Sequence, residues 1–103
     1  MTVYFKDQYL EDLYDNMQRG KPRYNQEVVR KFRERVNFLI EAKNTGEVRA
    51  MKSLHFEQLS GDKSGLYSMR INKYFRLEFS IDKEVTIQIE EVIIIHKLSN
   101  HYK

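Results

Sequence analysis

The sequence contains no cysteine, only one proline and only four glycines among its 103 residues. Without cysteine, neither a disulfide framework nor a thiolate metal site is available. No apolar run approaches the roughly 18 residues that would span a bilayer. The first six residues, Met-Thr-Val-Tyr-Phe-Lys, lack the apolar centre of a signal peptide. These absences predict a cytoplasmic protein without a membrane segment.

Signatures of bound cofactors are missing as well. The sequence has no glycine-rich phosphate loop, and its three histidines, His55, His96 and His101, lack the spacing of metal ligands. We therefore predict neither a nucleotide cofactor nor a metal. Because the chain has no internal repeat, low-complexity tract or linker, we expect one domain over residues 1–103 with one hydrophobic core.

The charges are unevenly distributed, although the net charge is only +3. Residues 18–35 contain seven cations and two anions, whereas residues 77–95 contain five anions and one cation, Lys83. The basic stretch is typical of a solvated helix exterior. The two halves therefore predict an electrostatically two-sided molecule.

Apolar residues recur at helical spacing in two segments of the N-terminal half. Asp7 is the predicted cap of a first helix that ends near Gly20, and Asn25 is the predicted cap of a second helix that reaches about Lys43. A short strand is expected at residues 3–5. Residues 48–56 are predicted to form a loop that contains a short helical turn.

From residue 67 onward the apolar period changes to two. The odd positions of residues 67–71 and 75–81 are apolar, with a tight turn at Asn72 and Lys73 between the two runs. Because side chains of paired strands share faces by parity, Arg70 and Arg76 are predicted to emerge together on the face away from the helices. A last strand over residues 85–96 is apolar enough to be central. The expected fold is α+β, with two N-terminal helices packed on one face of a small, mainly antiparallel, curved β-sheet.

The most distinctive motif lies between Leu54 and Leu77. It reads Leu-x(4)-Leu-x-Gly-Asp-Lys-x-Gly-x-Tyr-Ser-x-Arg-Ile-Asn-x-x-x-Arg-Leu. This motif resembles the RelE/ParE superfamily of bacterial toxins, most closely its HigB-like, plasmid-maintenance-killer branch, and the resemblance extends over nearly the whole chain. It implies a RelE-like fold and an mRNA endonuclease that works on the ribosome. In such a reaction the ribose 2′-hydroxyl attacks its own phosphate.

Three cations of the motif suit that chemistry, because guanidinium and ammonium groups can neutralise a dianionic phosphorane. The resemblance assigns this role to Arg76, Arg70 and Lys63. The alternative is that the arginines only keep the outer sheet face soluble, with Arg70 paired to Glu78 or Glu90 across strands. In the neighbouring turn, Lys73 and Tyr74 are candidates for substrate binding, since aromatic residues beside cations can stack on bases.

Proton transfer near neutral pH favours histidine. The HigB-like branch usually ends its last strand with Asp-Tyr-His, whereas this chain reads Asn100-His101-Tyr102-Lys103. We expect His101 to carry a proton and Tyr102 to stack on a base or assist the transfer, unless the terminal residues are frayed. His96 and His55 are further candidates for substrate binding.

Two other functions remain open from the sequence. One is a ParE-like inhibitor of DNA gyrase, and the other is a degenerate relative that has kept only its antitoxin-binding surface. For the toxins of this branch, the resemblance implies a helix-turn-helix antitoxin of the HigA type as partner, together with the ribosome and mRNA. The basic helix surface around Arg30 and Arg33 could then meet an acidic antitoxin or ribosomal RNA.

Overall fold

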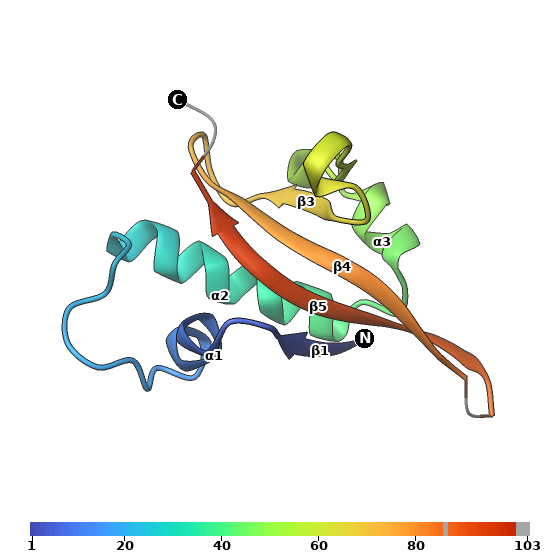
Figure 1. The fold of residues 1–103 in the computed structure, drawn as a ribbon, viewed down its shortest axis with the longest axis horizontal. Helices are drawn as coiled ribbons and strands as arrows, with labels where there is room; N and C mark the ends of the chain where they lie inside the picture. Colours follow the sequence, from blue (N-terminus) through green and yellow to red (C-terminus); the bar gives the residue numbers. More distant parts are fainter. Residues whose placement is uncertain (86, 101–103) are drawn as a thin grey trace.

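The computed structural model describes residues 1–85 and 87–100, and its elements are shown in Figure 1. The N-terminal half consists of one strand and three helices: β1 (Thr2–Phe5), α1 (Gln8–Tyr14), α2 (Gln26–Glu41) and α3 (Thr45–Ala50). The C-terminal half consists of four strands and two short 3-10 turns: η1 (Lys52–Leu54), β2 (Glu57–Gln58), η2 (Gly61–Lys63), β3 (Tyr67–Arg70), β4 (Arg76–Val85) and β5 (Ile89–Ser99).

The five strands form one sheet in the order β1-β5-β4-β3-β2. Strand β1 runs parallel to β5, and the other neighbours pair antiparallel. The predicted mainly antiparallel sheet is therefore confirmed, as is the inner position of the last strand. Figure 1 shows that β4 and β5 curve together and that their hairpin projects beyond the rest of the molecule.

Helices α1 and α2 pack against one face of this sheet, as the sequence predicted. Asp7 Oδ1 accepts a hydrogen bond from the Leu10 amide, and Asn25 Oδ1 accepts one from the Val28 amide, so both predicted caps are confirmed. Phe32 of α2 is fully buried in the same core cluster as Leu77 and Phe79 of β4. No helix among the described residues is both long enough and apolar enough to cross a membrane.

Two predicted helix boundaries were wrong. Helix α1 ends at Tyr14 instead of near Gly20, because Asn16 takes the left-handed conformation with φ of 59° and the chain turns away from the core. Helix α3 begins at Thr45, before the loop predicted for residues 48–56, because the Asn44 side chain accepts a hydrogen bond from the Glu47 amide and caps the helix.

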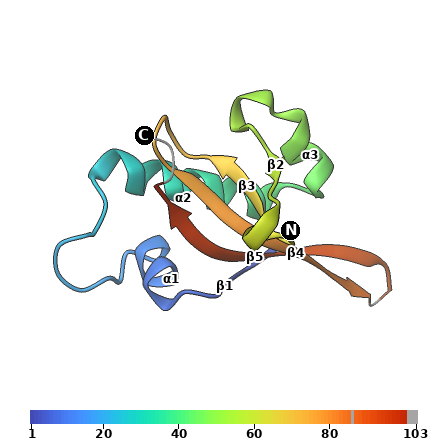
Figure 2. The same ribbon diagram turned by 45° about the horizontal axis from the view of Figure 1, so that its top comes forward.

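The sheet face away from α2, here called the open face, carries polar groups where β4 meets its neighbours. Along β4, Leu77 and Phe79 point into the core, so the even-numbered residues between and beside them point to the open face. A β-bulge interrupts the pairing with β5, where Glu78 pairs with Lys97 but Phe79 pairs with Ile95. His96 is the extra residue of this bulge. Figure 2 shows the chain between α3 and β3 at the β3 side of the sheet.

Candidate functional site

A set of polar side chains follows alternate positions of β4 on the open face. We call Arg76, Glu78 and Ser80 the polar row. Arg76 is only 8% exposed and Glu78 only 2% exposed, which is unusual for charged side chains. Buried charged groups cost free energy unless they are paired or hydrogen bonded, so such a row is a candidate functional site.

Arg76 is held in place by groups from two other segments. Its Nε donates to Ser68 Oγ on β3 at 2.9 Å, and one terminal nitrogen donates to the His55 carbonyl. The Glu57 carboxylate lies 4.0 Å from the same guanidinium. The Arg76 side chain therefore extends across β3 toward the segment that contains His55 and Glu57, and these contacts fix its orientation.

The predicted relation between the two arginines is partly confirmed. Arg70 and Arg76 are direct register partners on β3 and β4, so they do share a sheet face. The expectation that both project freely from that face was wrong for Arg76, because Ser68 and the segment around His55 bury its guanidinium. Parity within a strand predicts the face of a side chain but not what a distant loop places over it.

Lys63 lies beside the polar row because the turn η2 carries it there. Its Nζ contacts Glu78 Oε2 at 2.7 Å, and the two side chains are 34% and 3% exposed. Glu78 is also the cross-strand partner of Ser68. The carboxylate that was considered as a partner for Arg70 thus forms its ion pair with Lys63.

His96 continues the row toward β5. Its Nε2 lies 2.9 Å from Ser80 Oγ, and the β-bulge aims the ring at the open face. Burial lowers the pKa of the imidazole, Lys6 lowers it further, and Glu78 acts in the opposite direction. His96 is therefore neutral near pH 7 and able to accept a proton.

Stability should depend on pH through His96. Its pKa is lower in the folded state than in the unfolded chain, so the folded state binds fewer protons. The contribution is complete above the unfolded value of about 6.5 and is lost as the pH falls through the folded-state pKa. In urea unfolding at about pH 7.5 and pH 5.5, His96→Gln is expected to lose less stability on acidification than the wild type.

The exposed His55 provides the control for this measurement. Because His55 has φ of 46°, His55→Asn is the substitution that its left-handed backbone tolerates. This variant removes an imidazole that lies outside the polar row and so serves as the comparison for His96→Gln. An equal flattening in both variants would show that His96 is not the responsible group.

Five predicted site residues remain, namely Lys73, Tyr74, His55, His101 and Tyr102. Lys73 and Tyr74 lie in the β3–β4 turn, and the Lys73 Nζ lies 5.6 Å from the centre of the Tyr74 ring. His55 contributes its backbone carbonyl to Arg76, while its side chain is exposed. His101 and Tyr102 lie outside the described residues.

Several polar residues of the site were missed from the sequence. Ser68 and Ser80 are small and common residue types, and Lys97 joins the open face only because it is the cross-strand partner of Glu78 beyond the bulge. The hydroxyl of Ser99, the register partner of Arg76, is buried without a hydrogen-bond partner among the described residues. In the sequence, the signal for these residues was the polar character of the even-numbered positions of β4.

In residues 1–85 and 87–100, no group of three His, Cys, Asp or Glu side chains could hold a metal ion.

Comparison with known protein families identifies one matching family. The family model for the RelE-like toxin of type II toxin–antitoxin system HigB matches residues 3–91. No curated protein matches the chain significantly.

Solved structures share the fold at low sequence identity. A YoeB/ParE toxin from Agrobacterium tumefaciens is 21% identical with a TM-score of 0.56, and the match covers 99% of this chain and 100% of that chain. A YoeB–YefM complex from Staphylococcus aureus contains a chain that is 24% identical with a TM-score of 0.57, over 99% of this chain and 98% of that one. At these identities the structures establish a common fold.

Proposed function

This chain belongs to the HigB family of RelE-like toxins of type II toxin–antitoxin systems, and from that premise we propose that it is a ribosome-dependent endoribonuclease that cleaves mRNA and so inhibits translation. The observation that supports the proposal is the polar row beside Lys63 and His96. It combines cations and a neutral imidazole on one sheet face. Such a combination suits cleavage of a phosphodiester.

In the proposed reaction the ribose 2′-oxygen attacks the adjacent phosphorus, and the bond from phosphorus to the 5′-oxygen breaks. The products are a 2′,3′-cyclic phosphate and a 5′-hydroxyl. One proton leaves the 2′-hydroxyl and one reaches the departing 5′-oxygen. The protein therefore has to stabilise the phosphorane charge and to handle two protons.

We assign charge stabilisation to Arg76 and Lys63, with Arg70 as a further cation on the same face. Arg76 is preorganised by Ser68 and the His55 carbonyl, so little reorganisation is needed when charge develops on the phosphate.

For the first proton transfer we propose His96, whose Nδ1 makes no hydrogen bond to a described residue. Ser80 orients the imidazole ring of His96 through Nε2. Ser80 is not proposed as a nucleophile, because the RNA supplies its own 2′-hydroxyl. His101 remains our proposed carrier of the second proton, with Tyr102 stacking on a base. Tyr74, Lys73 and the side chain of His55 are proposed to bind the substrate.

A toxin of this kind requires an inhibitor. The similar YoeB structures from Staphylococcus aureus include complexes with YefM, described as toxin–antitoxin complexes. We propose that the partner of this chain is a helix-turn-helix antitoxin of the HigA type and that the toxin acts in the cytoplasm, where it meets ribosomes.

The test is cleavage of a defined mRNA by the purified protein with and without ribosomes, together with mapping of transcript 5′ ends after induced expression. We expect cuts that require ribosomes and leave 5′-hydroxyl ends. Growth arrest with intact transcripts and broken DNA would favour a ParE-like gyrase inhibitor. An absence of both arrest and cleavage would favour a degenerate relative that only binds antitoxin.

A further inference from the structure

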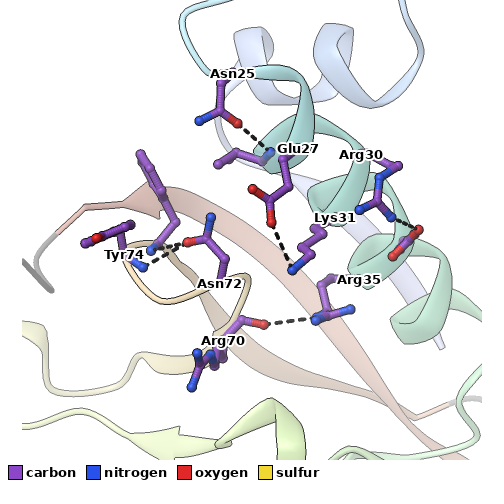
Figure 3. Close-up of polar contacts among 11 residues, drawn as sticks. Asn25, Glu27, Arg30, Lys31, Arg35, Arg70, Asn72 and Tyr74 are labelled. Atoms are coloured by element: carbon purple, nitrogen blue, oxygen red, sulfur yellow. Dashed lines mark hydrogen bonds and ion pairs between the residues drawn. The ribbon is translucent and has the colours of Figure 1, made fainter.

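A cationic cleft lies between α2 and the turn that joins β3 to β4. It has a volume of about 420 Å³, and we call it the hairpin cleft (Figure 3). Four cations line it, Lys31 and Arg35 from α2, Arg70 from β3 and Lys73 from the turn, with Glu27 as the single lining carboxylate. Lys31 and Arg35 are one helical turn apart, so both reach the cleft from the same helix face.

The positive charge of the hairpin cleft is only partly neutralised within the protein. Glu27 pairs with Lys31 at 3.2 Å. Among residues 1–85 and 87–100, no carboxylate forms an ion pair with Arg35, Arg70 or Lys73. The Arg35 Nε instead donates to the Arg70 carbonyl at 3.0 Å, as the dashed line in Figure 3 shows.

Arg35 is partly buried at this position. Burial lowers the pKa of its guanidinium, with a smaller opposing effect from Glu34. A partly desolvated cation without an ion pair costs free energy. An anionic ligand in the cleft would offset that cost, because it would restore a partner to the charge.

The turn at the edge of the cleft is held by side-chain hydrogen bonds and presents an aromatic ring. Asn72 Oδ1 accepts hydrogen bonds from the Tyr74 and Phe75 amides, each at 2.9 Å. Tyr74 is 48% exposed, and the Lys73 ammonium lies near its ring. A held aromatic face next to cations is an arrangement that binds a base and its phosphate together, which favours a nucleic acid strand over an acidic peptide.

The hairpin cleft also adjoins the polar row. Arg70 lines the cleft, and its register partner Arg76 belongs to the row on the same sheet face. Arg70, at the end of β3, therefore lies between the cleft and the row.

We propose that the hairpin cleft binds phosphodiester groups of RNA, with Tyr74 stacking on a neighbouring base. The proposal deepens the proposed function and rests on it for the choice of RNA as ligand. The same chemistry could serve the substrate strand or ribosomal RNA, and the experiment below distinguishes the two.

The test compares RNA binding by two matched double variants. Lys31→Gln/Lys73→Gln removes two cleft cations, whereas Lys21→Gln/Lys43→Gln removes two exposed lysines that line neither the cleft nor the row. One arm measures fluorescence anisotropy with a short single-stranded RNA in which 2′-deoxy substitutions prevent cleavage. The other arm measures sedimentation with ribosomes that carry no mRNA. Both are run at about 50 and 200 mM salt.

The cleft variant is expected to bind about tenfold more weakly at low salt, with a salt slope reduced by about 1 to 2, while the control variant changes little. A cleft-specific loss in the oligonucleotide arm assigns the cleft to the substrate strand, and a loss only in the ribosome arm assigns it to ribosomal RNA. Equal losses in both variants, or cleft-dependent binding of a short oligoglutamate peptide instead of RNA, would overturn the proposal.

Arg35→Gln provides a second test at the partly buried cation, with thermal unfolding to establish that the variant is folded. It should weaken RNA binding in the same arm as the lysine variant. Because the RNA probe cannot be cut, these results do not depend on nuclease activity. Loss of cleavage with cleft-dependent binding intact would contradict the endonuclease and leave the cleft assignment standing.

Discussion

Arg76→Ala is expected to lower ribosome-dependent mRNA cleavage by about 10²-fold or more. That is the scale seen when a preorganised charge aimed at the transition state is removed. The Arg76 guanidinium is fixed by hydrogen bonds to Ser68 Oγ and the His55 carbonyl. A neighbouring cation that makes neither hydrogen bond would not take its position. Single-turnover cleavage on programmed ribosomes measures the effect directly.

The same substitution should also destabilise the fold, by about 1–3 kcal/mol, because buried acceptors lose their donor. Thermal unfolding must therefore accompany the kinetics, and Arg19→Ala is a suitable control because Arg19 is exposed in the segment between α1 and α2. Arg76→Lys should recover part of the rate, since it keeps the charge but not the forked geometry. A folded Arg76→Ala protein that cuts at the wild-type rate would reduce Arg76 to a structural residue.

Lys63→Met is expected to produce a second large loss, again about 10²-fold in cleavage rate, because it removes the more exposed of the two cations assigned to the phosphorane. It should also lower the free energy of unfolding by about 2 kcal/mol, since the Glu78 carboxylate is 3% exposed and loses a charged partner. Chemical denaturation and single-turnover cleavage on the same preparation give both numbers.

The double variant Lys63→Met/Glu78→Gln separates the two effects. Replacing the buried carboxylate with a neutral amide removes the charge that lost its ammonium partner, so most of the lost stability should return. The cleavage rate should stay low because the cation is still missing. Recovery of both quantities together would mean that Lys63 acts only by neutralising Glu78.

Much of the fold could be predicted from local patterns in the sequence. The caps at Asp7 and Asn25, the alternation along β3 and β4, and the apolar run of β5 each depend on residues that are close in sequence. The same alternation correctly assigned Arg70 and Arg76 to one face. These features are predictable because the periods of helices and strands are properties of the local backbone.

The candidate site was less predictable, because its contacts join distant residues. Lys63 and Glu78, which form an ion pair, are 15 residues apart in the sequence, and Arg76 and His55, which share a hydrogen bond, are 21 residues apart. Neither spacing follows from a helical or strand period. The burial of Arg76 was missed for this reason, although the motif had already singled out both Lys63 and Arg76.

The sequence by itself therefore determined the family resemblance, the strand faces and the identity of the principal cations. Only the tertiary structure decided that Arg76 is buried, that a bulge turns His96 toward Ser80, and that α2 and the β3–β4 turn enclose the hairpin cleft. The reason is physical. Side-chain direction is encoded by the period of each element, whereas burial, ion pairing and cleft formation depend on how loops bring separate elements together.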